Sequence, residues 1–205
     1  MDKTNLEKLR GRKAEVIQTE SCRRSSVCVP YLEGADGPEL LFEVRSSKIK
    51  TQPGDICFPG GHLEKDETPL MTAIRETCEE LLTEPDQIAP VCPLDTFCDG
   101  CLMINAYLAK LYGYTGSFST DEVAEVFTVP LKWFEENEPQ RHTIELVHLK
   151  SETFPYHLIN GGENYHFRRR FDDELFYVCR DSSGKERVIW GITARIIKNL
   201  TTLIK

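Results

Sequence analysis

Residues 61–83 have the sequence GHLEKDETPLMTAIRETCEELLT. Thr68 followed by Pro69 predicts a helix that begins at Pro69, because threonine caps helices well and the N–H that proline lacks has no partner in the first turn. Pro85 then stops the helix. Four side chains recur at helical spacing and predict its buried face: Leu70, Ile74, Thr77 and Leu81.

Three glutamates lie on another face of the same helix. At about 100° per residue, Glu76, Glu79 and Glu80 fall within an arc of roughly 100° that avoids the apolar stripe. Such a cluster is typical of a solvated acidic face, although repulsion within it weakens the helix by about a few tenths of a kcal/mol. The alternative is a site for a hard cation, because oxygen ligands without His or Cys favour Mg²⁺ or Mn²⁺.

The neighbours of the cluster favour the cation site. Arg75 lies one turn before Glu79 and can hold a carboxylate through a bidentate contact. Glu67 precedes the N-cap, where the positive end of the helix stabilises a negative charge. Gly60 and Gly61 allow the backbone to pack closely against whatever the carboxylates bind.

At full spacing this pattern resembles the Nudix box, G-x5-E-x7-R-E-U-x-E-E-x-G-U, in which U is aliphatic. The matching positions are Gly61, Glu67, Arg75, Glu76, Glu79 and Glu80. Thr77 and Thr83 occupy aliphatic positions, and Leu82 stands where the pattern has glycine. These departures affect packing and the exit from the helix, and none of them removes an acidic residue of the pattern.

A second resemblance lies just upstream. Leu41, Ser46, Gly54 and Phe58-Pro59-Gly60-Gly61 are similar to the signature of coenzyme A pyrophosphatases, L-L-T-x-T-[SA]-x3-R-x3-G-x3-F-P-G-G. In this chain Lys50 takes the arginine position, whereas Glu43 and Arg45 replace the two threonines. Residues 120–127 and 190–194 also resemble segments of that group, so the likeness spans roughly residues 25–200.

The pattern of elements predicts an α+β domain with a mixed sheet, because strands mix with a few helices without regular alternation. We expect a helix at about 4–17, opened by a Thr4-x-x-Glu7 capping box, and an amphipathic helix at about 192–204. Strands are expected at 27–32, 40–45, 91–97, 102–111, 123–129, 176–180 and 187–189, and a short helix at 131–134. The resemblance implies a single Nudix hydrolase domain over residues 1–205, folded as an α/β/α sandwich around a central mixed sheet.

The resemblance also implies metal-dependent cleavage of the diphosphate of coenzyme A or its thioesters. The products would be 3′,5′-ADP and 4′-phosphopantetheine or its acyl form. Glu76, Glu79 and Glu80 match the metal-binding glutamates, Glu67 matches the glutamate that supports them, and Arg75 matches the residue that orients them. Mg²⁺ or Mn²⁺ would polarise the phosphoryl oxygens and lower the pKa of a bound water.

The sequence leaves the catalytic base open. Glu79 and Glu80 are candidates within the box. Glu122 and Glu125 are candidates outside it, because their segment resembles a family loop near the site, although both could equally be surface acids at the start of a strand. The expected substrate contacts combine cationic partners for phosphate with close backbone approach: Arg45, Lys50, Gly60 and Gly61.

Two other functions remain open. The altered threonine and arginine positions allow a Nudix pyrophosphatase of another specificity, for ADP-ribose, NADH or an oxidised nucleotide. A non-catalytic Nudix-fold sensor of a nucleotide is the third possibility, but such a module has no need of four matching acidic residues.

The resemblance implies a small-molecule substrate as the partner, and composition argues against other classes of partner. The chain has 25 Lys and Arg against 33 Asp and Glu, a net charge of −8, which argues against a nucleic-acid clamp. No apolar run approaches the roughly 18 to 20 residues of a membrane span, and the charged N-terminus is unlike a signal peptide, so we expect a cytoplasmic protein. The apolar C-terminal helix could serve a homodimer.

The eight cysteines suit a reducing compartment, where small buried thiols are common. Cys98-Asp99-Gly100-Cys101 has CxxC spacing between two apolar runs, which predicts a hairpin with facing thiols. Redox or metal chemistry at this pair is the alternative.

Overall fold

A mixed β-sheet forms the centre of the molecule. The computed structural model describes residues 22–99, 101–147 and 151–205. Strand β1 (Arg23–Gly34) pairs in parallel with β7 (Leu102–Leu111) and antiparallel with β2 (Gly37–Arg45). The other strands of this sheet pair antiparallel: β3 (Ile56–Cys57), β4 (Gly60–His62), β5 (Ile88–Pro93), β6 (Phe97–Cys98) and β8 (Val123–Pro130). The predicted mixed central sheet is therefore confirmed.

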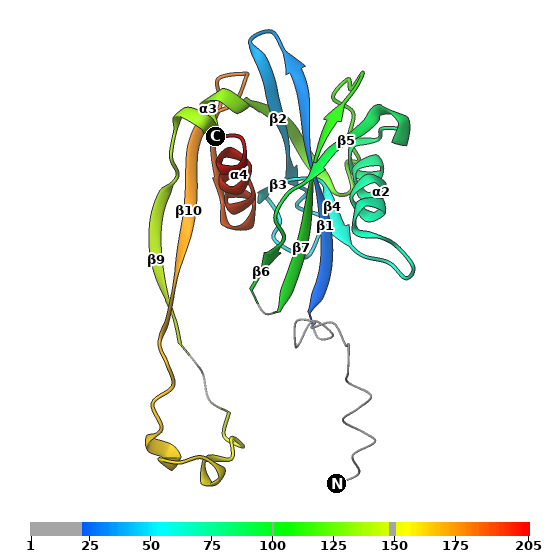
Figure 1. Ribbon diagram of the computed structural model, residues 1–205. Helices are drawn as coiled ribbons and strands as arrows, with labels where there is room; N and C mark the ends of the chain where they lie inside the picture. The colour runs from blue at the N-terminus through cyan, green and yellow to red at the C-terminus, as the bar shows by residue number, and fades with distance from the viewer. Residues whose placement is uncertain (1–21, 100, 148–150) are drawn as a thin grey trace, which may run out of the picture.

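Helices pack on both faces of the central sheet. Helix α2 (Pro69–Leu81) packs on one face, and α3 (Leu131–Glu136) and α4 (Gly191–Leu203) lie on the other, as Figure 1 shows. A second, antiparallel sheet joins α4 and consists of β9 (Gln140–Leu146), β10 (Arg170–Arg180) and β11 (Glu186–Trp190). The α+β sandwich is as expected, but the sequence did not predict that its last strands form a separate sheet.

Strand β2 shows how the sheet separates two cores. Side chains alternate along a strand, so neighbouring residues face opposite layers. Leu40 and Phe42 pack in the core toward α4, whereas Leu41 packs in the core toward α2. Glu43 follows with the same parity as Leu41 and is directed to the side of α2. An acidic residue thus occupies a core position of this strand.

Helix α2 begins as predicted. The Thr68 hydroxyl accepts a hydrogen bond from the Met71 N–H at 3.3 Å, and Pro69 is the first helical residue. Within the helix, the hydroxyl of buried Thr77 donates to the Ala73 carbonyl at 2.6 Å, so a threonine fits an aliphatic position without an unsatisfied donor. The expected buried stripe is only partly correct, because Leu70 and Ile74 are half-buried while Glu80 is fully buried.

The helix ends at Leu81, four residues before Pro85, through a left-handed residue. Leu82 has φ 47° and ψ 50°, and its N–H donates to the Cys78 carbonyl. Glycine adopts this conformation without strain, which explains why the box pattern places glycine here. Thr83 after it bonds through its hydroxyl to the Gln87 side chain at 2.8 Å, which anchors the 3₁₀ turn Pro85–Gln87.

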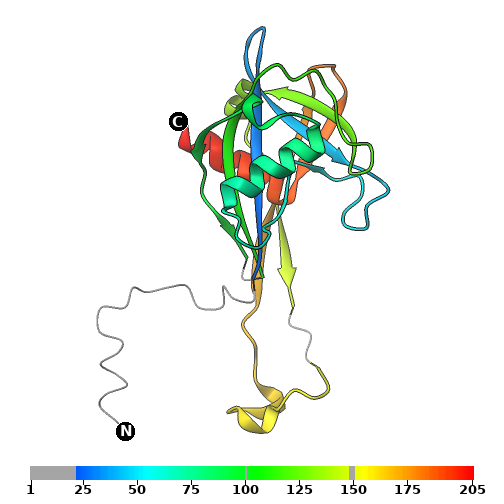
Figure 2. The same cartoon turned by 90° about the vertical axis from the view of Figure 1, so that its right-hand side faces the viewer.

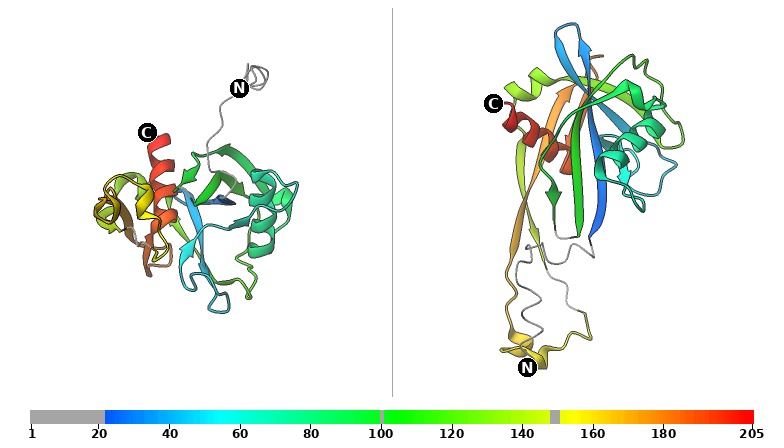
Figure 3. Two further views of the ribbon diagram at one scale, coloured as in Figure 1. Left: turned by 90° about the horizontal axis from the view of Figure 1, so that it is seen from below. Right: turned by 45° about the vertical axis from the view of Figure 1, so that its right-hand side comes forward.

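A hairpin arm extends from the second sheet. Strand β9 and the first part of β10 project beyond the body of the molecule, which Figures 2 and 3 show from the side and from below. Every residue of β9 is exposed, so no apolar alternation marked this strand in the sequence. Two 3₁₀ turns, Tyr156–Leu158 and Gly162–Asn164, lie toward the end of the arm.

Most other predicted elements are present. The strands predicted at 27–32, 40–45, 102–111, 123–129, 176–180 and 187–189, the helix at 131–134 and the C-terminal helix all occur within six residues of the expected bounds. The strand predicted at 91–97 is wrong as one element, because Pro90 and Pro93 lack N–H donors and the chain forms β5 and β6 with a break between them. The helix predicted at 4–17 lies outside the described residues, and the single-domain organisation stays a prediction.

The Cys98–Cys101 hairpin is present, but its thiols do not face each other. Cys98 pairs with Met103 across the hairpin, and the Asp99 carboxylate accepts the N–H groups of Cys101 and Leu102. Asp99 thus caps the turn, and this local bonding sets a register that separates the two cysteines. Both thiols are free in the structure.

Candidate active site

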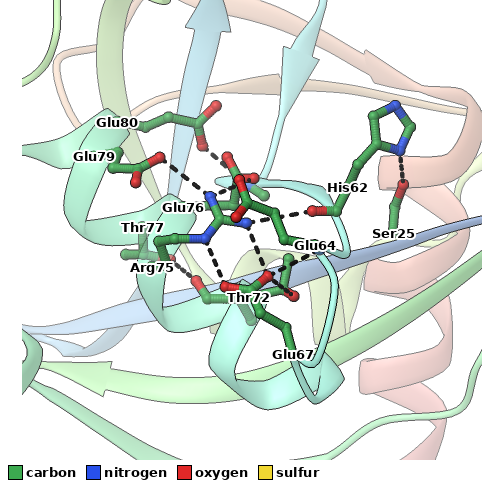
Figure 4. A network of polar contacts seen from close by, with 12 residues as sticks. Ser25, His62, Glu64, Glu67, Thr72, Arg75, Glu76, Thr77, Glu79 and Glu80 are labelled. Atoms are coloured by element: carbon green, nitrogen blue, oxygen red, sulfur yellow. Dashed lines mark hydrogen bonds and ion pairs between the residues drawn. The ribbon is translucent and has the colours of Figure 1, made fainter.

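Arg75 lies at the centre of the carboxylate cluster on α2 (Figure 4). Its Nε donates to Glu67 Oε1 at 2.8 Å and its Nη2 donates to Glu67 Oε2 at 3.1 Å, a bidentate pair. Nη1 donates to Glu76 at 2.9 Å and to Glu79 at 3.2 Å. Nη2 also donates to the His62 carbonyl at 3.3 Å, which joins the helix to β4. A single guanidinium therefore fixes three of the four box glutamates.

Glu67 is committed to holding Arg75. Its Oε2 also accepts from the Thr72 hydroxyl at 2.7 Å and from the Glu64 N–H at 3.1 Å. The hydrogen bonds from Arg75, then those from Thr72 and Glu64, hold the pKa of Glu67 at about 2. In return, the bond to Glu67 raises the pKa of Arg75. Both oxygens of Glu67 are thus engaged by the protein, whereas among the described residues Glu76, Glu79 and Glu80 each accept hydrogen bonds through one oxygen.

Glu80 has the opposite environment. Its side chain is 3% exposed, and its Oε2 accepts the Gly60 N–H at 2.8 Å. No salt bridge to Glu80 forms among residues 22–99, 101–147 and 151–205. Burial first, and then the nearby charge of Glu43, raise the pKa of Glu80 to about 9. Burial likewise raises the pKa of Glu76. Ionised carboxylates here need a cation to offset their loss of water.

The two glycines before the helix allow this close packing. A Cβ on Gly60 would lie 2.7 Å from the Cα of Val27, and a Cβ on Gly61 would overlap the Glu76 carboxylate. Gly60 also has φ 158°, a conformation that L-residues rarely adopt. Only glycine therefore fits either position.

Glu43 of β2 is a further acidic residue of the site, and it was not among the residues predicted from the sequence. It is 1% exposed, its Oε1 accepts from the Cys57 thiol at 3.3 Å, and its Oε2 has no hydrogen-bond partner among the described residues. Burial raises its pKa to about 7, with further contributions from neighbours that include Glu122 and Glu76. Its presence as an acid within the apolar run 40–44 was the signal that could have revealed it.

The two candidate bases outside the box, Glu122 and Glu125, lie in different parts of the structure. Glu122 lies in the exposed loop before β8, and its charge contributes to the raised pKa of Glu76 and of Glu80. Glu125 pairs with Val44 in the sheet and so faces the α4 side, opposite to α2. There it binds the Arg187 guanidinium at 2.9 Å and the Lys185 ammonium at 2.9 Å, and the bonds from Arg187 lower its pKa to about 2. The structure brings Glu122, but not Glu125, to the carboxylates.

A cleft of about 990 Å³ adjoins the carboxylates. Gly60 and Gly61 line it on one side while they contact Glu80 and Glu76 on the other. Arg45 lines it as well, whereas Lys50 is exposed on the β2–β3 loop, outside the lining that the described residues form. The far wall comes from the second sheet and α4 and includes Asp172, Glu174, Trp190, Thr193 and Arg195.

The donor set fits a hard divalent cation by its chemistry. It consists of oxygens on one rigid helix, one of them a buried carboxylate without a cationic partner in the described residues. As they stand, no three His, Cys, Asp or Glu side chains in the described part of the chain converge closely enough to hold an ion. Glu76 and Glu79 are turned toward Arg75 instead, so binding requires these two side chains to reorient.

Comparison with known proteins agrees with this geometry. The NUDIX domain family matches residues 23–157, about two thirds of the chain. The chain belongs to the Nudix family. Nudix hydrolases generally need a divalent metal cation.

The chain is also similar to two curated relatives and to one solved structure. The peroxisomal coenzyme A diphosphatase NUDT7 of Mus musculus is 37% identical over 117 residues, 56% of this chain and 50% of that protein. The mitochondrial Nudix hydrolase 15 of Arabidopsis thaliana is 29% identical over 181 residues, 85% of this chain and 56% of that protein. This Nudix chain thus spans about half the length of these relatives. A C. elegans Ap4A hydrolase structure matches 56% of this chain and 84% of its own, with 24% identity and a TM-score of 0.47.

Proposed function

We propose that this Nudix protein is a metal-dependent diphosphatase that cleaves coenzyme A or its thioesters to 3′,5′-ADP and 4′-phosphopantetheine or its acyl form. The observation that carries the proposal is the Arg75-centred carboxylate cluster beside the cleft at Gly60–Gly61. The likeness to a coenzyme A diphosphatase, at 37% identity, supports the choice of substrate.

In this proposal Glu76, Glu79 and Glu80 hold Mg²⁺ or Mn²⁺, and Glu67 supports them by fixing Arg75. A bound divalent cation supplies electrophilic assistance to the phosphoryl group and makes a water more acidic. Arg75 keeps the carboxylates of Glu76 and Glu79 near one another before the cation arrives. The apolar burial of Glu80 strengthens its attraction to a cation, because the local dielectric constant is low.

We propose that the catalytic base is an exposed carboxylate of the cluster, either Glu79 or Glu122. Glu79 has a side chain that is 57% exposed, and Glu122 is exposed in the loop before β8, so either can reach a water in solvent contact. Glu80 is kept as a ligand, since its Oε2 is held by the Gly60 N–H. Glu125 is not proposed as a base, because its carboxylate binds Arg187 and Lys185 on the opposite face.

We assign substrate binding to Gly60 and Gly61 of β4 and to Arg45 at the end of β2. Gly60 and Gly61 of β4 line the cleft without side chains, so a phosphate can come close to the backbone there. Arg45 in the cleft can pair with a phosphate through its guanidinium fork, and Nε already donates to the Thr51 carbonyl at 3.2 Å, which positions it. Lys50 lies on the same β2–β3 loop and would reach a phosphate only at the rim of the cleft.

The test is a substrate panel with product identification. Purified protein with Mg²⁺ is incubated with coenzyme A, acetyl-coenzyme A, ADP-ribose and NADH, and products are separated by chromatography. We expect 3′,5′-ADP from coenzyme A, abolished by EDTA. Turnover of ADP-ribose or NADH with none of coenzyme A would discard the proposed substrate and favour another Nudix pyrophosphatase. Tight binding of one ligand without turnover would instead favour a nucleotide sensor.

Location and assembly are further parts of the proposal. No helix among the described residues is long and apolar enough to cross a bilayer. We propose a cytoplasmic protein, against relatives named as peroxisomal and mitochondrial, and imaging of a tagged chain in cells tests this. A homodimer is also proposed. The apolar face of α4 packs in the core of the chain, so Leu203 and Ile204 near its end are the exposed apolar residues it offers, and light scattering of the purified protein would show a mass twice that of the 23.5 kDa chain.

A further inference from the structure

Glu43 has an oxygen that the described protein leaves unsatisfied. Cys57 donates to its Oε1 at 3.3 Å, but Oε2 has no hydrogen-bond partner among the described residues, although the side chain is only 1% exposed. Buried charged groups are normally paired or bound to a metal. This oxygen therefore requires a proton or a cation as its partner.

The strand register brings Glu43 to the box. Glu43 pairs with Cys57 on β3, three residues before Gly60, the first residue of β4, whose N–H binds Glu80. Its parity along β2 directs it to the α2 side, with Leu41. Two buried carboxylates, Glu43 and Glu80, thus flank the same short segment from different elements.

The charges around this pair are mostly negative. Glu43 is the neighbour that most raises the pKa of Glu80, and Glu76 and Glu122 act on both in the same direction. Arg75 is engaged by Glu67, Glu76 and Glu79. Arg45 offsets part of the charge of Glu43, yet it forms its hydrogen bond with the Thr51 carbonyl. The protein groups around the pair therefore offer little positive charge to either carboxylate, and a divalent cation can supply it.

We propose that Glu43 is a further oxygen ligand of the divalent cation, binding it from outside the box beside Glu80. This inference rests on the proposed function and adds a residue to its metal site. The coenzyme A pyrophosphatase signature has a threonine at this position, so the carboxylate adds a negative ligand that the pattern lacks. A negative ligand binds a hard cation more tightly than a hydroxyl does.

The test measures Mn²⁺ affinity by electron paramagnetic resonance of the free ion. The full chain is compared with Glu43→Gln, which keeps the shape, and Glu43→Thr, which restores the pattern residue. Glu39→Gln is the matched control, because it removes the same charge at the other end of β2. We expect both Glu43 variants to bind Mn²⁺ at least about tenfold more weakly, and the control to be unchanged. The Mn²⁺-induced rise in melting temperature shrinks in parallel.

Folding is checked without metal by circular dichroism and thermal melting. Glu43→Gln removes repulsion from Glu80, so it should melt at or above the wild-type temperature. Folded variants that bind Mn²⁺ as tightly as wild type would overturn the inference, and so would a Glu43→Gln protein that fails to fold, because the carboxylate would then stabilise the metal-free state. If the wild type itself neither binds Mn²⁺ nor turns over any substrate, the proposed function fails instead.

Discussion

Arg75 is the residue on which the geometry of the cluster depends. Its guanidinium holds Glu67 with two bonds and Glu76 and Glu79 with a third nitrogen, a fork that a lysine ammonium cannot reproduce. Substitution Arg75→Lys keeps the charge and removes the fork. We expect kcat/KM to fall by about 10- to 100-fold, the range seen when a partner that orients metal ligands is lost.

Steady-state kinetics at saturating Mg²⁺ measure this effect. Arg180→Lys is the control, because Arg180 is exposed on β10 and bonds only to the Gly184 carbonyl among the described residues. An Arg75→Lys enzyme with full activity would show that charge alone, without orientation, is sufficient.

Leu82 carries local strain at the end of α2. A left-handed conformation at a non-glycine residue costs about 1 to 2 kcal/mol, and the Leu82 side chain is 58% exposed, so it recovers little by packing. Leu82→Gly relieves the strain but adds freedom to the unfolded chain. We expect a net stabilisation of about 0.5 to 1 kcal/mol in urea unfolding.

Leu82→Ala separates strain from side-chain loss, because alanine keeps the Cβ that causes the strain. It should not stabilise the protein. Equal stabilisation by both substitutions would mean that exposure of the leucine, rather than its backbone conformation, is the unfavourable feature.

At the scale of elements, an ion cluster connects β8 to the β10–β11 hairpin. Arg187 is 6% exposed, donates to Asp181 at 2.8 Å and to Glu125 at 2.9 Å, and lies over the Phe127 ring at 4.1 Å. Burial opposes ionisation of Asp181, but hydrogen bonds from Ser183 and Arg187 outweigh it and set its pKa at about 2. The cluster joins the central sheet to the second sheet.

The pKa of Asp181 fixes the sign of a pH effect. A folded-state pKa below the ordinary value stabilises the protein above about pH 4, and this stabilisation is lost as the pH falls toward about 2. Asp181→Asn should therefore destabilise the protein by about 1 to 3 kcal/mol at pH 7, the cost of a buried partner left unpaired, and by less at pH 3.

Urea unfolding at pH 7, 4 and 3 checks this difference. Asp121→Asn serves as control, because Asp121 forms an exposed pair with Lys48. A difference between Asp181→Asn and wild type that does not shrink at low pH would exclude the ion pair as its source.

Sequence patterns predicted the elements that carry periodicity or caps. Thr68 and Pro69 defined the start of α2, and apolar runs defined β1, β2 and β7. Strand β9 was missed because all its residues are exposed, and the strand predicted at 91–97 is divided into β5, which ends at Pro93, and β6. The separate second sheet could not be predicted, because strand partners depend on contacts between distant segments.

Across the whole molecule, the site depends on surfaces that only the fold brings together. The acidic face of Glu76, Glu79 and Glu80 was predicted from spacing along one helix, since helix geometry fixes which side chains share a face. The opposite wall of the cleft comes from β11 and α4, more than a hundred residues later, and Glu43 comes from β2. Glu122 and Glu125 were indistinguishable in the sequence, and only the sheet register separates them.

The central claim is the proposal that a divalent cation held by the buried carboxylate of Glu80 is needed for hydrolysis of the diphosphate of coenzyme A. The most direct measurement is the rate of 3′,5′-ADP release from coenzyme A by wild-type protein and by folded Glu80→Gln, each with Mg²⁺ and with EDTA. The account predicts release only by the wild type with Mg²⁺, with kcat at least about a hundredfold lower in Glu80→Gln. Equal release by both proteins, or release that EDTA leaves unchanged, would contradict it.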